Sequence, residues 1–280
     1  MAASRSRALD EWLFFFLASV LRLTCELYVG PLRQPVGCIR QRSNDEGVVK
    51  GTQTERIKLL SEVEVLEPLS AQQLEWVAQR TLDRSFQKGE SVYVPGDASE
   101  LVYLLLTGRV RLYGMARQGE LTFDIIRAGD VFGEVSLTER TQNEHAQALE
   151  SSQVGLLELN TFWHLVRENA EFNVRVIRML GERSRMARAR MTDIALKESP
   201  ARLAALILDL VQGEGVVTRE GHYRVSTPYT HEDLASMIGL KRVSITRAFR
   251  GLQDSGYVQL KRRQIHVTDL AALKGLAAEN

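Results

Sequence analysis

Between residues 80 and 159, short apolar runs alternate with turn residues, which is the pattern of β-strands. Glycine-led turns such as Pro95-Gly96 and Ala128-Gly129-Asp130 separate the runs. Strands at intervals of roughly 8–15 residues predict a small antiparallel barrel or jelly roll. The predicted runs are 91–94, 101–106, 110–113, 121–126 and 154–159.

The pattern changes to a helical one over residues 170–197, which contain no proline. Apolar side chains recur there near the 3.5-residue spacing of a coiled-coil seam. A helix of about 28 residues would be roughly 42 Å long, more than a small barrel can cover. We therefore expect parallel self-association, with a solvated helix lying on its own barrel as the alternative. The predicted dimerisation residues are Phe172, Val176, Met179, Arg183, Met186 and Ile194.

A mixed pattern follows the long helix. Ser199 and Pro200 suit an N-cap and the first position of a helix that stops at Gly213. Residues 216–225 predict a hairpin that turns at Glu220-Gly221. The coarse order is therefore a barrel, a long helix and a smaller domain of helices and strands.

Residues 230–252 carry the most specific motif. Thr230 and Asp233 can form a capping box at the start of a short apolar helix. Gly239 permits the left-handed conformation of a tight turn, and a second helix begins near Lys241. This spacing is that of a helix-turn-helix, whose second helix enters the major groove of DNA.

The second helix and the hairpin after it have the chemistry of a DNA-binding surface. Arginine can pair with guanine O6 and N7, and lysine or arginine at a hairpin tip suits phosphate. The alternative is a helical hairpin with a solvated basic face. The predicted DNA-binding residues are Lys241, Arg242, Ser244, Arg247 and Arg250 on the helix, with Lys261, Arg262 and Arg263 on the wing.

Composition does not contradict this interpretation. The 280 residues hold 36 Lys+Arg against 35 Asp+Glu, and 44% are hydrophobic, as in an ordinary globular protein. Residues 241–266, however, hold seven Lys or Arg and only one acid, Asp254. The near-neutral total therefore conceals a polarised chain that is basic where phosphate would lie.

The first fifty residues add little to the fold. Cys25 and Cys38 are the only cysteines, too few for an iron–sulfur cluster, and a reducing cytoplasm is the expected setting. The apolar run 13–23 is too short to span a membrane. A secretory signal is the alternative, although acids precede the run and no clean cleavage site follows. We expect a poorly structured extension that reflects a mis-assigned start, and no membrane partner.

The predicted fold class is α+β. An N-terminal antiparallel β jelly roll precedes a long dimerisation helix and a C-terminal winged helix-turn-helix domain. The expected limits are 1–53 for the extension, 54–169 for the barrel, 170–197 for the long helix and 198–280 for the DNA-binding domain.

This arrangement resembles the cyclic-AMP receptor protein/FNR (Crp/Fnr) family of bacterial transcription regulators. Residues 129–137 resemble the family's phosphate-binding cassette, and residues 230–239 and 242–247 resemble its helix-turn-helix. The resemblance implies a cyclic-nucleotide-binding-like barrel and a homodimer on a two-fold related, palindromic DNA site. It also implies that an activator contacts RNA polymerase.

The cassette departs from a cyclic-nucleotide binder. The resemblance implies that Glu134 would hold the ribose, and this residue is present, but Glu144-His145 stand where arginine and serine would hold the phosphate. A carboxylate repels a phosphate diester. We therefore expect a regulator that needs neither cyclic AMP nor another cofactor, with a sensor for cyclic AMP or another small anion as the alternative. The candidate pocket residues are Gly133, Glu134, Val135, Ser136, His145 and Arg183, and Arg183 suits either an anion or a salt bridge.

The recognition helix departs as well. The family's Arg-Glu-x-x-x-Arg is here Arg242-Val243-x-x-x-Arg247, so we expect two guanine contacts and an apolar contact of Val243, such as with a thymine methyl. An enzyme is the remaining class. No P-loop, dinucleotide fingerprint, nucleophile–base motif or metal-ligand spacing supports it.

Overall fold

The structure is a computed structural model that describes residues 52–117 and 119–279. The predicted extension of residues 1–53 lies outside this part, apart from Thr52 and Gln53. Two capped helices lead into the barrel: Thr52 caps α2 (Gln53–Ser61), and Ser70 caps α3 (Ala71–Ala78). The short 3-10 helix η2 (Glu64–Leu66) lies between them.

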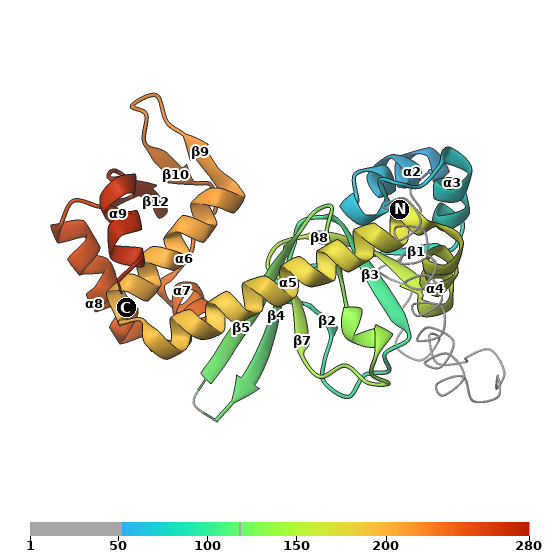
Figure 1. The fold of residues 1–280 in the computed structure, drawn as a ribbon, viewed down its shortest axis with the longest axis horizontal. Coiled ribbons are helices and arrows are strands. Elements are labelled where there is room, and N and C mark those ends of the chain that lie inside the picture. The colour runs from blue at the N-terminus through green and yellow to red at the C-terminus, as the bar shows by residue number, and fades with distance from the viewer. Residues whose placement is uncertain (1–51, 118, 280) are drawn as a thin grey trace, which may run out of the picture. The chain divides into compact units, whose positions relative to one another are not determined.

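Eight strands then form the barrel as two antiparallel four-stranded sheets (Figure 1). This confirms the predicted jelly roll. Five strands fall on the predicted apolar runs. The first sheet has the order β1 (Thr81–Phe86), β8 (Ser152–Glu158), β3 (Leu101–Thr107), β6 (Val131–Phe132), and the second β2 (Ser91–Tyr93), β7 (His145–Ala148), β4 (Arg109–Ala116), β5 (Gly119–Arg127).

Three strands were not among the predicted runs, and β7 shows why. Its inward positions are Ala146 and Ala148, both buried, while His145 and Gln147 are half-buried. Alanine fills the interior where β7 pairs with β2 and β4, but it is not a strand former. The 3-10 helix η3 (Glu134–Leu137) follows β6. Strand pairing rather than local sequence therefore determines this part of the barrel.

Two helices complete the N-terminal half, α4 (Leu159–Glu168) and α5 (Ala170–Leu196). The side chain of Asn169 accepts a hydrogen bond from the Phe172 amide at 2.9 Å and so caps α5. Figure 1 shows α5 passing along the barrel strands. Phe172 is fully buried among residues of α2, α3 and β3. The start of α5 is thus part of the barrel's own core.

The C-terminal half is a winged helix-turn-helix. Its elements are α6 (Ser199–Glu214), β9 (Gly215–Val217), β10 (Tyr223–Val225), α7 (His231–Ile238), α8 (Arg242–Asp254), β11 (Val258–Lys261), β12 (Gln264–Val267) and α9 (Leu270–Ala277). The strands form a four-stranded antiparallel sheet in the order β11-β12-β10-β9. Helices cover one face of this sheet, where Val225, Val258, Ile265 and Val267 are buried.

The ends of α6 differ from the prediction. Glu198, not Ser199, is the N-cap residue, so Pro200 lies in the first turn. The helix also continues through Gly213 to Glu214. At Gly213 a Cβ atom would lie 3.0 Å from the guanidinium of Arg127, so the missing side chain leaves room for the arginine. Gly213 therefore lies within α6 and does not end it.

Candidate functional site

The helix-turn-helix is built by local contacts. The Thr230 amide donates to Asp233 Oδ2 at 2.8 Å, and the Asp233 amide donates to Thr230 Oγ1 at 3.1 Å, which is the predicted capping box. Gly239 has a φ of 63°, and the Leu240 amide donates back to Ala235 at 3.0 Å. These contacts fix the angle between α7 and α8.

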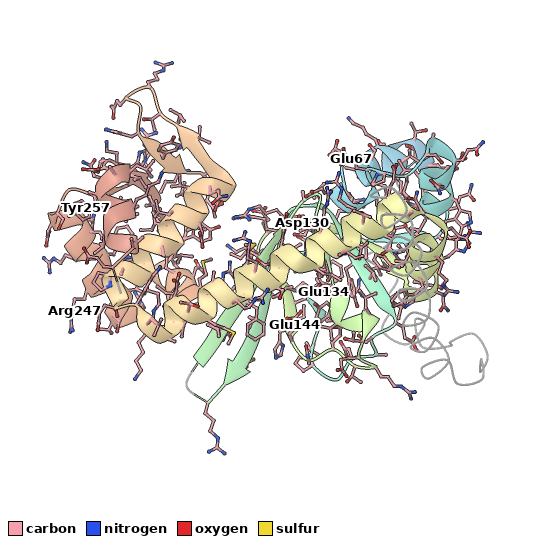
Figure 2. All side chains as sticks on the ribbon, viewed as in Figure 1. Glu67, Asp130, Glu134, Glu144, Arg247 and Tyr257 are labelled. Atoms are coloured by element: carbon pink, nitrogen blue, oxygen red, sulfur yellow. The ribbon has the colours of Figure 1, made fainter. Side chains whose placement is uncertain are left out.

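The recognition helix α8 turns an apolar face to the core and a cationic face to solvent. Ile245, Ala248, Phe249 and Leu252 are buried, whereas the Val243 side chain is 71% exposed. Arg247 projects from the outer side of α8 (Figure 2). Within residues 52–117 and 119–279, no acid forms an ion pair with the cations of this face. The exposed predicted residues are Lys241, Arg242, Val243, Arg247 and Arg250, and Ser244 is half-buried.

One residue of this motif was missed by sequence reasoning. His231 Nδ1 lies 3.0 Å from Thr246 Oγ1, and that hydroxyl donates to the carbonyl of Arg242 at 3.0 Å. The His231 ring also packs on Phe249, with ring centroids 5.4 Å apart. A threonine four residues after Arg242 was the available signal. His231 thus joins the start of α7 to α8.

The wing carries its cations on a tight turn. Lys261 pairs with Gln264 across the hairpin, which leaves Arg262 and Arg263 as the two turn residues. Both have left-handed backbones, with φ of 51° and 65°. Such turns favour Asn-Gly, and a left-handed backbone costs another residue type about 1–2 kcal/mol. Arg262 and Arg263 therefore form a strained tip, and Lys261 is the last residue of the strand before it.

The solvent face behind this tip is also positive. The pKa of His266 on β12 is lowered by partial burial and by the positive charges of Lys261 and Arg224. A cationic environment disfavours a further proton on the imidazole. The positive charge of the wing therefore reaches His266 on β12.

In the barrel, the pocket residue Glu134 is engaged by the long helix. Arg183 of α5 forms an ion pair with Glu134 at 2.7 Å and also donates to the carbonyl of Val131. Gly133 precedes Glu134 with a φ of 77°, and a Cβ atom there would lie 2.5 Å from the ring of Tyr103. The structure thus brings three of the candidate residues together, Gly133, Glu134 and Arg183. The arginine is already paired.

Glu144 is a second carboxylate near Glu134 (Figure 2). It accepts a hydrogen bond from the hydroxyl of Tyr93 at 3.1 Å. Burial and the nearby charge of Glu134 raise the pKa of Glu144 to about 7. Tyr93 itself packs on Tyr103 with ring centroids 5.0 Å apart, and burial raises its pKa strongly. Two carboxylates, Glu134 and Glu144, therefore lie close to a single arginine, Arg183.

The remaining pocket candidates have local partners. The Ser136 hydroxyl is buried, donates to the carbonyl of Leu101 at 2.8 Å, and accepts hydrogen bonds from Ser99 and Gln142. His145 stacks on Tyr113 with ring centroids 4.9 Å apart. Val135 is half-buried in η3. Ser136 and His145 are therefore held by the barrel itself.

Most of the predicted dimerisation residues of α5 pack against their own barrel. Phe172 and Val176 are buried in their own chain, and Met179 packs against the same core. Arg183 of that set binds Glu134, and only Met186 and Ile194 are exposed. An opposite stripe with the same alternating spacing of three and four is exposed throughout: Val174, Ile177, Gly181, Ser184, Arg188, Met191 and Ala195.

Comparison with known proteins agrees with this architecture. Residues 83–169 match the family model of the cyclic nucleotide-binding domain, and residues 201–276 match that of the Crp-like helix-turn-helix domain. The global nitrogen regulator of Nostoc sp. is 26% identical over 187 residues, which are 65% of this chain and 83% of the relative. The CRP-like cAMP-activated global transcriptional regulator of Mycobacterium tuberculosis is 24% identical, over 66% of this chain and 83% of the relative.

Solved structures show the same fold. A CRP-family transcriptional regulator from Thermus thermophilus has a TM-score of 0.59 and 26% identity, over 70% of this chain and 96% of that chain. FixK2 from Bradyrhizobium japonicum has a TM-score of 0.64 at 22% identity, over 71% of this chain and 98% of that chain.

A cyclic-nucleotide-binding-like barrel joined through a long helix to a DNA-binding helix-turn-helix defines a transcription regulator, and the relatives are regulators rather than enzymes. The chain belongs to the Crp/Fnr family. Among the helices of the described residues, none is long and apolar enough to cross a membrane.

Proposed function

We propose that the chain is a homodimeric transcription regulator that binds a palindromic DNA site without requiring cyclic AMP. One observation carries the independence from cyclic AMP. Arg183 is paired with Glu134 at 2.7 Å, and the resemblance to cyclic-nucleotide binders puts Glu144 where a cation would hold the phosphate.

Cyclic AMP should bind poorly because its phosphate would lose water and gain no free cation in return. A cyclic phosphate entering this pocket would compete with Glu134 for Arg183 and would approach Glu144, a carboxylate at pH above about 7. Removing an anion from water is unfavourable unless a cation or several donors replace the solvent. The ligand-gated alternative needs an anion that displaces Glu134 from Arg183, which is the outcome to test against.

The exposed stripe of α5 supports the homodimer. Val174, Ile177 and Met191 are 49%, 59% and 68% exposed, which is unusual for apolar residues repeated along one helix face. Alternating spacings of three and four are those of a coiled-coil seam. A second copy of α5 would bury the stripe while each barrel keeps Phe172. From family membership we also propose contact with RNA polymerase.

Met191→Glu tests the dimer, and Ala189→Glu is the matched control because Ala189 is exposed on the same helix but lies outside the stripe. We expect Met191→Glu to yield monomers in analytical ultracentrifugation and Ala189→Glu to remain dimeric. Monomers of the unaltered chain, or a dimeric Met191→Glu variant, would contradict the proposed seam.

Selection of DNA sites from a random library tests the palindrome. The full chain, purified without cyclic AMP, should recover a two-fold related sequence. Recovery of the palindrome only after cyclic AMP is added would instead support the ligand-gated alternative. Recovery of no palindrome under either condition would overturn the proposed function.

A further inference from the structure

One arginine of the barrel bonds directly to the DNA-binding half. Arg109 on β4 makes a bidentate pair with Glu150, Nε to Oε1 at 3.1 Å and Nη2 to Oε2 at 2.9 Å. Its remaining Nη1 donates to Thr227 Oγ1 at 2.6 Å. Thr227 lies between β10 and α7, in the segment that leads to the cap residue Thr230. A single guanidinium therefore spans 118 positions of sequence.

The network continues beyond Thr227. The Thr227 hydroxyl donates to Glu214 Oε2, and the hydroxyl of Tyr229 donates to the other oxygen of Glu214 at 2.5 Å. Tyr229 is buried, and burial together with Glu214 raises its pKa. Glu214 ends α6, so the chain of hydrogen bonds joins the barrel to α6 and to the segment before α7. Every polar group in it has a partner.

Apolar and neutral contacts run beside this network. Ile125 of β5 is buried within the hydrophobic core of the winged helix, where Leu206, Leu210 and Met237 also lie. Thr122 Oγ1 lies 3.0 Å from Ser236 Oγ on α7. Strand β5 of the barrel thus supplies part of the packing of the helix-turn-helix.

We propose that Arg109 is a positioning residue for DNA recognition. It holds the helix-turn-helix at a fixed orientation on the barrel and so sets the distance at which a homodimer reads its two half-sites. The inference rests on the proposed function and supplies a physical reason why no effector is needed. A binding-competent arrangement that is already populated costs no ligand energy to reach.

The chemistry requires arginine at this position. Its planar fork binds the two Glu150 oxygens and still has a donor for Thr227, which a lysine ammonium cannot reproduce in fixed geometry. Burial opposes the charged guanidinium, but the hydrogen bonds and charge of Glu150 outweigh it, so that the pKa of Arg109 is raised. Arg109 is therefore charged at any pH at which the fold exists.

The chain offers a matched control two residues along the same strand. Arg111 pairs with Glu120 at 2.9 Å, donates to Gln147 at 3.1 Å and lies 4.0 Å from the ring centroid of Tyr113. All these partners belong to the barrel. Arg111→Gln thus removes a similar charge and similar bonds without touching the DNA-binding half.

The experiment selects DNA from a library of inverted half-sites with randomised spacing, using the full chain and four variants. Arg109→Gln and Thr227→Val remove the bond between the two halves, whereas Arg111→Gln and Thr227→Ser keep it. We expect the unaltered chain and both controls to select one spacing. The two test variants should select the same half-site sequence over several spacings and bind the original site about tenfold more weakly, as expected for the loss of one charged hydrogen bond.

A purely structural role would lower the amount of folded protein but would not broaden the spacing at an unchanged half-site sequence. Should Arg109→Gln unfold, Thr227→Val decides, since it is nearly isosteric and leaves Arg109 paired with Glu150. One preferred spacing and unchanged affinity in Thr227→Val would overturn the inference while leaving the proposed function intact. Failure of the unaltered chain to select paired half-sites would instead count against the proposed function.

Discussion

The arginines of α8 and those of the barrel differ in whether an acid of the same chain is paired with them. In the barrel, Arg183 is paired with Glu134, and Arg109 with Glu150. On α8, Arg242 and Arg247 are exposed, and in residues 52–117 and 119–279 no acid lies within ion-pair distance of them. Cations with partners in their own chain maintain the fold, whereas cations without them are available to an external anion.

The difference has an energetic consequence. An anion that enters the sensor pocket must replace an existing charge pair, and breaking a partly buried pair is costly. DNA that approaches α8 displaces only water and counterions, so each phosphate contact is gained without a broken bond. The same residue type therefore has opposite roles in the two regions.

The largest expected effect is at Arg242. Replacing it with alanine should weaken binding to the selected palindrome by about 1–3 kcal/mol, because a bidentate contact to guanine is lost. Binding to random DNA should fall far less. Fluorescence anisotropy with both DNAs measures the ratio of the affinity for the palindrome to the affinity for random DNA.

Arg250→Ala is the comparison variant for Arg242, since it removes a charge from the last half of the same helix. Arg250→Ala should weaken binding to the selected palindrome and to random DNA by the same factor. Equal losses on specific and random DNA for Arg242→Ala would contradict the assignment of Arg242 to base reading.

The next largest effect is expected at Glu144, which should make the free energy of unfolding depend on pH. Its folded pKa of about 7 lies above the usual value near 4.5. A group with a raised folded pKa contributes stability that is complete below its unfolded pKa and is lost as the pH rises through the folded pKa. The free energy of unfolding should therefore fall between about pH 4.5 and 7, by about 1–2 kcal/mol after allowance for partial solvent exposure.

Glu144→Gln isolates this contribution from other acids whose pKa is raised by burial, such as Asp130 and Asp209. Urea unfolding from pH 5 to pH 8 should show that the variant gains stability over the unaltered chain only toward high pH. A constant difference between the two proteins across this range would show that Glu144 does not titrate there.

Substitutions at the wing tip should raise the stability of the fold and lower its affinity for DNA. Asn and Gly fit the left-handed turn of Arg262 and Arg263. The free energy of unfolding of the double variant Arg262→Asn, Arg263→Gly should therefore be about 1 kcal/mol higher than that of the unaltered chain. Its affinity for all DNA should drop, with a slope of log K against log salt that is shallower by about 2. Unchanged salt dependence would show that the wing tip does not contact phosphate.

Val243 should give the smallest effect. Val243→Ala removes apolar surface from an exposed side chain, so the fold should keep its stability, and binding should weaken only about threefold at sites with the preferred thymine. A binding series with single base changes in the palindrome locates the affected position. Equal loss at every position would exclude a base contact of Val243.

The sequence predicts the DNA-binding half well because its signals are local. Thr230, Asp233 and Gly239 act within one or two helical turns, and the structure has each in the expected role. The long helix is different. Its stripe with Phe172 and its stripe with Ile177 have the same spacing, and only packing against the barrel determines which one is covered.

Long-range contacts lie further beyond sequence reasoning. The bond between Arg109 and Thr227 joins a barrel strand to a loop of the winged helix, and neither residue belongs to a motif. Glu134 and Arg183 were both predicted at the pocket, but their mutual pairing depends on the path of α5. Tertiary structure therefore determines which arginine is free.

The affinity of the unaltered chain for its selected palindrome, measured with and without saturating cyclic AMP, tests this account most directly. Because Arg183 is already neutralised by Glu134, we predict the same dissociation constant in both conditions. Binding to the palindrome that appears only with cyclic AMP, and is lost in Arg183→Gln, would contradict it.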